Sequence, residues 1–110
     1  MPTYNKLVRD RIPFIISSQG KECRTRILDT EEYTEELKVK LNEEVEEYTK
    51  ADNDQEALEE LADMQEVIRA LAEAHGSNWV QLENIRVDKA EARGGFKERV
   101  YLIDVDDDLE

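Results

Sequence analysis

The chain has 110 residues, enough for one compact domain with a single core, so we expect one domain spanning residues 1–110. Apolar and charged residues each make up 39% of the sequence, which leaves few core positions for a lone monomer and favours a homodimer or a higher homo-oligomer. The formal net charge of −13 excludes general binding of nucleic-acid polymers, because such proteins carry a basic surface.

The N-terminal residues indicate neither a secretory leader nor a membrane anchor. The stretch MPTYNKLVRDRIPFII lacks a charged start followed by an unbroken apolar run, and no later stretch reaches membrane-spanning length. Cys23 is the only cysteine, so neither an internal disulfide nor a cysteine-based zinc site is possible. We therefore expect a cytoplasmic protein without a membrane partner, in which Cys23 is a half-buried strand residue.

A short first helix is predicted from Arg9 or Asp10 to Ser18. Pro13 suits the first turn of this helix, and a glycine follows its end. Asp10 is the expected N-terminal cap. Residues 23–28 alternate weakly between polar and apolar, and residues 98–105 alternate more clearly, which allows a small two-stranded β ribbon between them.

Two long antiparallel helices are predicted next. The first begins at Asp29 or Thr30, where an N-cap residue precedes two glutamates, and runs to about Ala51. The second is capped by Asp52 or Asp54 and stops at His75-Gly76. Spacings of three and four residues give each helix an apolar stripe, formed by Tyr33, Leu37, Leu41, Val45 and Tyr48 in the first and by Leu58, Leu61, Met64, Ile68 and Leu71 in the second.

A fourth helix is predicted from the cap at Ser77 or Asn78 to Arg93, where Gly94 and Gly95 end it. The expected fold is therefore all-α: an antiparallel bundle of about four helices, with the possible β ribbon as its only sheet.

The negative charge is concentrated in the two long helices. Between Asp29 and Glu73 there are 17 acidic and four basic residues, whereas the rest of the chain has 11 of each. On a helical wheel Glu46 falls opposite the apolar stripe, as a surface residue should. Glu44 instead falls inside that stripe, and Glu47 lies at its edge.

Glu60 and Asp63 fall inside the apolar arc of the next helix. Each long helix thus presents two acids spaced i, i+3 towards its partner. A buried carboxylate needs a cation, a proton or several donors, and a single one of these glutamates would be read as a surface residue. The coincidence of two such pairs favours a metal site made of Glu44, Glu47, Glu60 and Asp63. Oxygen ligands without cysteine or histidine favour Mg²⁺, with Mn²⁺ possible, over zinc.

The same residues resemble a known family. KLNEEVEEY and EALEELADMQEVIRAL are similar to the ExxE…ExxD signature of the MazG-like all-alpha NTP pyrophosphatase superfamily. The flanking NKLVRDRIP and KAEARGGF resemble its phosphoribosyl-ATP pyrophosphohydrolase-like house-cleaning subgroup, over about Tyr4 to Leu102. The resemblance implies a magnesium-dependent enzyme that hydrolyses an NTP or dNTP to the monophosphate and pyrophosphate. It implies that all four acids bind metal and that Glu44 or Glu47 polarises the attacking water.

Basic residues provide candidates for binding the phosphates. Lys89 and Arg93 match basic positions of the family, and Lys6, Arg9 and Arg11 cluster near the start of the first helix. Arg86 is expected to pair with the acidic helices. Trp79 and Phe96 are candidates for stacking on a base, although large aromatic residues in small domains more often lie in a core or an interface.

Two other functions are compatible with the sequence. One is a catalytically inactive acidic helical module whose carboxylates recognise a protein partner. The other is a metal-dependent nucleotide sensor that binds without turnover. Carboxylates on apolar faces favour metal chemistry over a solvent-facing surface for a protein partner. The sequence does not indicate which base of the nucleotide is recognised.

Overall fold

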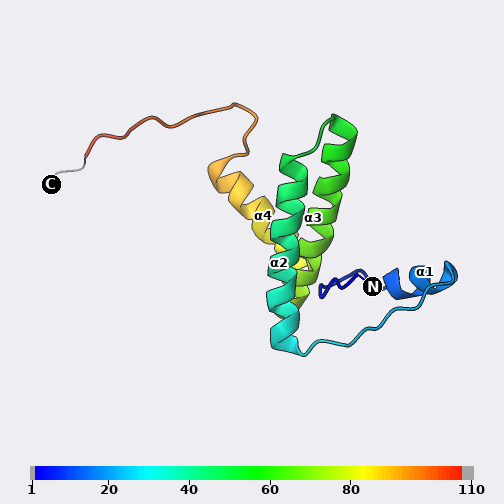
Figure 1. Ribbon diagram of the computed structural model, residues 1–110. Coiled ribbons are helices and arrows are strands. Elements are labelled where there is room, and N and C mark those ends of the chain that lie inside the picture. Colours follow the sequence, from blue (N-terminus) through cyan, green and yellow to red (C-terminus); the bar gives the residue numbers. More distant parts are fainter. Residues whose placement is uncertain (1, 108–110) are drawn as a thin grey trace. The chain divides into compact units, whose positions relative to one another are not determined.

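A computed structural model describes residues 2–107, and helices are the regular secondary structure of that range. The helices are α1 (Ile12–Ser18), α2 (Thr30–Thr49), α3 (Asp54–Ala74) and α4 (Trp79–Arg93) (Figure 1). The predicted all-α fold is thus confirmed. The chain divides into two compact units, with the boundary after Trp79.

The first unit is built on α2 and α3, which pack side by side in opposite directions (Figure 1). Asp29 caps α2 through a capping box: its Oδ1 accepts a hydrogen bond from Glu32 N at 2.8 Å, and Glu32 Oε1 accepts one from Asp29 N at 3.4 Å. This confirms the predicted start at Asp29. The helix ends at Thr49, two residues before the predicted end, and a short connection leads into α3.

The cap of α3 is Asn53, so the prediction of Asp52 or Asp54 was wrong. Asn53 has an extended backbone with φ −151°, and its Oδ1 accepts a hydrogen bond from Glu56 N at 2.9 Å. Asparagine and aspartate cap helices about equally well, so three such residues in a row leave the choice to the course of the connecting backbone. The predicted end is confirmed, with His75 as C-cap and Gly76 in the left-handed region at φ 79°.

The start of α1 also differs from the prediction. Arg11 occupies the N-cap position without a side-chain cap bond, so Asp10 is not the cap. The helix begins at Ile12, with Pro13 in its first turn as expected. Because α1 has only seven residues, it would not be stable as an isolated helix in water.

The predicted β ribbon is not observed. Residues 23–28 and 98–105 both lack strand structure, and Cys23 is exposed instead of half-buried. Two short segments cannot form a stable ribbon without a third strand or a helix to cover their apolar face, and the first segment has arginines at two of its six positions.

The core of the described residues is very small. Only Leu37 and Val67 are buried among them, at 4% and 8% exposure. The predicted apolar stripes of α2 and α3 are therefore only partly covered within one chain; exposed members of the two helices are Val39, Val45, Tyr48, Leu58 and Leu61. Within residues 2–107 no helix has the length and apolar character needed to cross a membrane.

Candidate metal centre

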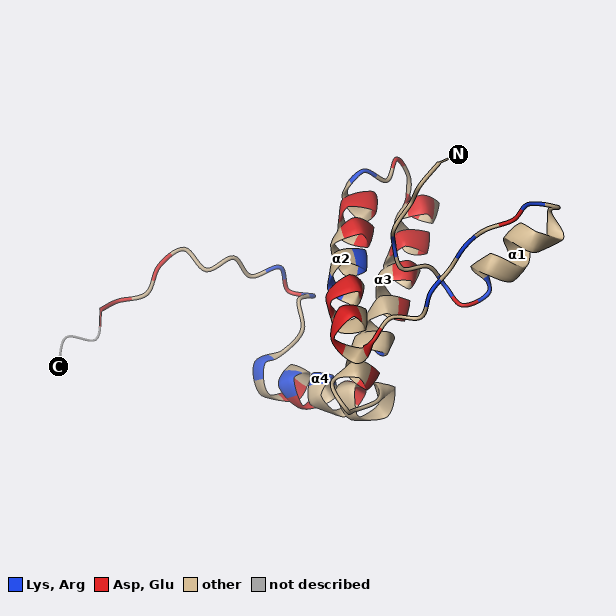
Figure 2. Ribbon diagram, turned by 60° about the horizontal axis from the view of Figure 1, so that its bottom comes forward, with Lys and Arg blue, Asp and Glu red and all other residues tan. Residues whose placement is uncertain are grey.

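Acidic residues, red in Figure 2, recur along much of the length of α2 and α3. Three of them converge: Glu44 from α2 and Glu60 and Asp63 from α3 each offer a carboxylate oxygen, and these oxygens all lie within 4.8 Å of one another. All three residues are half-buried. Among the acids predicted as ligands, these three are the ones that the helical wheel placed on apolar faces. The structure brings them together, and their assignment as metal ligands stays a prediction.

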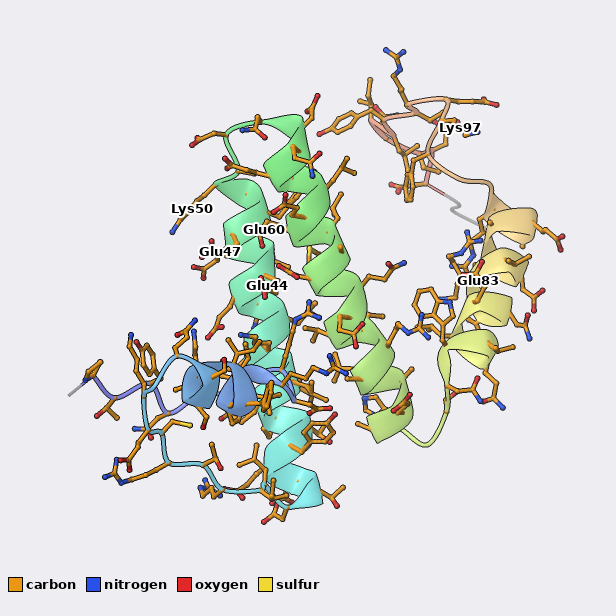
Figure 3. The ribbon with its side chains drawn as sticks, turned by 90° about the vertical axis from the view of Figure 1, so that its right-hand side faces the viewer. Glu44, Glu47, Lys50, Glu60, Glu83 and Lys97 are labelled. Atoms are coloured by element: carbon orange, nitrogen blue, oxygen red, sulfur yellow. The ribbon has the colours of Figure 1, made fainter. Side chains whose placement is uncertain are left out.

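The helical hairpin accounts for this convergence. Glu60 and Asp63 are three residues apart, which places them on the same face of α3 one turn from each other. The antiparallel packing of α2 then brings Glu44 to that face, and Figure 3 shows Glu44 and Glu60 on the facing sides of the two helices. No glycine or proline interrupts either helix, so the spacing is held by continuous backbone hydrogen bonding.

The electrostatics of the cluster are unfavourable in the absence of a cation. The pKa of Glu60 is raised above its ordinary value, first by desolvation and then by the negative charges of Glu44 and Asp63, with a hydrogen bond to Glu44 acting in the same direction. The protonated form of Glu60 is therefore favoured relative to an isolated glutamate. A positive charge placed among the three carboxylates would remove the repulsion that raises this pKa.

Glu47, the fourth predicted ligand, has a different position. It lies on α2 one turn after Glu44, and its side chain is exposed (Figure 3). Its charge also contributes to the raised pKa of Glu60, as the last of the causes. The structure thus places Glu47 near the cluster but does not include it among the converging ligand atoms.

The basic residue Arg9 contacts the cluster. Arg9 Nη2 donates a hydrogen bond to Asp63 Oδ1 at 2.7 Å, and the side chains of the two residues are 57% and 39% exposed. These residues are 54 positions apart. Sequence reasoning had proposed Arg9 as a phosphate ligand but had not identified its pairing with Asp63, because no local pattern relates residues so far apart.

The remaining candidate phosphate ligands are Lys6, Arg11, Lys89 and Arg93. Lys6 Nζ stands over the ring of Tyr4, 6.0 Å from its centroid. Arg11 is exposed at the start of α1. Lys89 and Arg93 are exposed on α4, within the part of the chain that follows Trp79. The assignment of all four to phosphate binding stays a prediction.

Two further expectations concern α4 and the aromatic residues. Arg86 pairs inside its own helix, donating from Nη2 to Glu83 Oε2 at 2.7 Å and from Nε to Glu83 Oε1 at 2.9 Å, which lowers the pKa of Glu83.

Trp79 and Phe96 are the two candidates for stacking on a base. The ring of Trp79 is covered by the guanidinium of Arg69, at 5.0 Å from the ring centroid. Phe96 is 98% exposed.

Comparisons with known proteins do not assign the chain to a family. No family model, curated protein or solved structure matches it. Function is therefore inferred from the chemistry of the carboxylate cluster and its surroundings.

Proposed function

We propose that this protein is a metal-dependent nucleoside triphosphate pyrophosphohydrolase of MazG-like type, which cleaves an NTP or dNTP to the monophosphate and pyrophosphate in house-cleaning of the nucleotide pool. The observation that carries the proposal is the convergence of Glu44, Glu60 and Asp63 from two helices, with ligand oxygens within 4.8 Å of one another. The reaction breaks the bond between the α and β phosphates and adds one water molecule across it.

The donor set suits a hard divalent cation. All three converging groups are carboxylates, the ligands that Mg²⁺ and Mn²⁺ prefer, and neither Cys23 nor His75 is among them. All three are half-buried rather than enclosed, which leaves coordination positions for water and phosphate oxygens. The pKa of Glu60 is raised first by desolvation and then by the charges of Glu44 and Asp63, and a cation bound among these carboxylates would offset that repulsion.

The four acidic residues have different proposed roles, cation binding and proton acceptance. Glu44, Glu60 and Asp63 would hold the cation, with Glu47 as a fourth ligand or an outer contact. A bound divalent cation supplies charge neutralisation of the triphosphate and a more acidic water. Glu47 is exposed and one helical turn from Glu44, so either carboxylate is placed to accept a proton from the attacking water.

Five basic residues are proposed to bind the phosphates, and they come from two parts of the chain: Lys6, Arg9 and Arg11 precede α1, and Lys89 and Arg93 lie on α4. Arginine and lysine both neutralise phosphate, and arginine adds paired hydrogen bonds. Arg9 has direct support for this role, because its contact with Asp63 places a guanidinium at the edge of the carboxylate cluster.

The protein is further proposed to act as a homo-oligomer in the cytoplasm. Leu58 and Leu61 on α3 are 61% and 42% exposed, and Val45 and Tyr48 on α2 are 41% and 42% exposed. Exposed apolar residues at helical spacing on two packed helices are typical of a surface that a second copy of the chain covers.

The proposal is tested with a panel of ribo- and deoxynucleoside triphosphates, following pyrophosphate release with Mg²⁺, with Mn²⁺ and with a chelator. We expect turnover of at least one nucleotide that requires the cation. Asp63→Asn and Glu47→Gln should each lower it on the order of 100-fold or more, as loss of a transition-state contact does. Glu46→Gln, which alters an exposed glutamate on the same helix, is the control and should keep the activity.

The same panel separates this function from its alternatives. Divalent-cation and nucleotide binding without turnover would favour a nucleotide sensor. Absence of divalent-cation binding by calorimetry, together with absence of turnover, would reject the enzyme and favour an acidic protein-interaction module.

A further inference from the structure

The contact between Arg9 and Asp63 differs from the other arginine–carboxylate pairs of the chain. Arg26, which precedes α2, donates two hydrogen bonds to Glu32 in the first turn of that helix, at 3.2 and 3.1 Å. Arg86 likewise makes two bonds to Glu83 within α4. Two-bond pairs between neighbouring residues stabilise local structure. Arg9 instead pairs with Asp63, which is 54 positions away in the sequence and belongs to the candidate metal centre.

Resting on the proposed function, we propose that Arg9 exchanges partners when the metal centre fills: it neutralises Asp63 in the cation-free protein and is transferred to a phosphate oxygen of the substrate once a divalent cation takes Asp63. Arg9 would thereby couple cation binding to substrate binding at the same site.

The chain favours such an exchange because the pair is easily separated. The side chain of Arg9 is 57% exposed and that of the half-buried Asp63 is 39% exposed, and an ion pair open to solvent in this way contributes little to stability. A divalent cation bound by Asp63 would also repel the guanidinium at close range. The cation-free contact is therefore a competitor that Mg²⁺ can displace rather than a fixed part of the fold.

The backbone around Arg9 limits the movement to the side chain. The carbonyl oxygen of Arg9 accepts a hydrogen bond from Ile12 N at 3.0 Å, which ties this residue to the first turn of α1. Lys6 and Arg11 lie within three residues of Arg9, so the freed guanidinium stays among positive charges that attract a triphosphate. Rotation about the Arg9 side-chain bonds is then sufficient to change its partner.

The exchange predicts opposite effects of one substitution on two ligands. Arg9→Gln removes the competitor for Asp63, so we expect the variant to bind Mn²⁺ alone about three- to tenfold more tightly than the wild type in calorimetry. The same variant loses its phosphate contact, so it should bind magnesium tripolyphosphate, titrated at a fixed excess of Mg²⁺, at least about tenfold more weakly. Arg9→Lys, which keeps the charge but not the planar fork, should fall between the two proteins in both measurements.

Arg24→Gln is the matched control, since it removes one exposed positive charge from the same unit. It should change both affinities less than twofold. A variant that fails to fold would bind both Mn²⁺ and magnesium tripolyphosphate more weakly. Circular dichroism of each variant checks that it is folded. Opposite shifts therefore cannot come from misfolding.

Each outcome decides a different point. If Arg9→Gln binds Mn²⁺ no more tightly than the wild type does, Arg9 does not compete for Asp63 and the exchange is wrong. Tighter Mn²⁺ binding with unchanged tripolyphosphate binding would also overturn it, because Arg9 would then have no phosphate role. A wild-type protein that binds no divalent cation would instead overturn the proposed function itself.

Discussion

Glu44 on α2 and Glu60 on α3 approach each other so closely that the pKa of Glu60 is raised both by the charge of Glu44 and by a hydrogen bond that the protonated Glu60 donates to it. Two carboxylates on neighbouring helices can share a proton or share a cation, but two negative charges in contact oppose folding. Repulsion between these two carboxylates therefore lowers the stability of the helical hairpin formed by α2 and α3. Both protonation and cation binding should relieve it, and the two effects can be measured separately.

Glu60→Gln should stabilise the cation-free protein at neutral pH, because it removes one of the repelling charges. The folded pKa of Glu60 lies above the unfolded one, so between these values the folded state binds more protons and stability falls as pH rises. The advantage of the variant should therefore be present at pH 7 and disappear as pH falls below the unfolded pKa. Thermal unfolding of both proteins from pH 4 to 8 in the presence of a chelator measures this difference in stability. Glu46→Gln is the control, and an equal pH-dependent gain there would assign the effect to net charge.

Divalent cations should stabilise the wild-type protein against unfolding. A cation that binds only the folded state adds about 1.4 kcal/mol when its free concentration is ten times its dissociation constant. We expect the midpoint temperature of unfolding to rise when Mg²⁺ or Mn²⁺ is added and to fall back to its original value when a chelator removes the cation. Asp63→Asn and Glu60→Gln should both abolish the rise. A rise that persists in both variants would place the cation elsewhere, for example among the other acids of α2 and α3.

The convergence of Glu44, Glu60 and Asp63 could be predicted from the sequence because a carboxylate on an apolar face conflicts with a strong rule. Periodicity fixed which side of α2 and α3 Glu44, Glu60 and Asp63 occupy, and antiparallel packing then left one way for them to meet. Glu47, at the edge of the stripe, gave a weaker signal, and its side chain is exposed. The contact between Arg9 and Asp63 could not be predicted, because it depends on the path of the N-terminal segment rather than on any repeat.

The cap of α3 shows a second limit of the sequence. Three consecutive residues, Asp52, Asn53 and Asp54, are all good caps, and only the backbone decides which one is used. Asn53→Ala should therefore lower the free energy of unfolding by about 1 kcal/mol, since it removes the bond to Glu56 N. Asp52→Ala should have an effect within about 0.5 kcal/mol. Chemical denaturation checks both, and a larger loss from Asp52→Ala would show that the helix starts one residue earlier.

The exposed apolar residues of α3 allow the proposed oligomer to be tested. Leu58 is 61% exposed and Leu61 is 42% exposed within one chain, so a charge at either position should leave the isolated hairpin folded. A second copy packed over them would have to bury that charge, which is costly. Leu58→Asp combined with Leu61→Asp should therefore reduce the mass in solution from a multiple of 12.8 kDa to that of one chain, as light scattering after size exclusion would show.

Leu37→Ala provides the contrast. Leu37 is buried within the chain at 4% exposure, so its truncation should cost about 2–4 kcal/mol of stability. Because the lost contacts lie inside the hairpin, the number of copies should stay the same wherever the variant remains folded. If the wild-type protein already has the mass of one chain at micromolar concentration, the exposed residues of α3 are not a self-association surface. The open apolar face would then belong to a different protein partner, as in the interaction-module alternative.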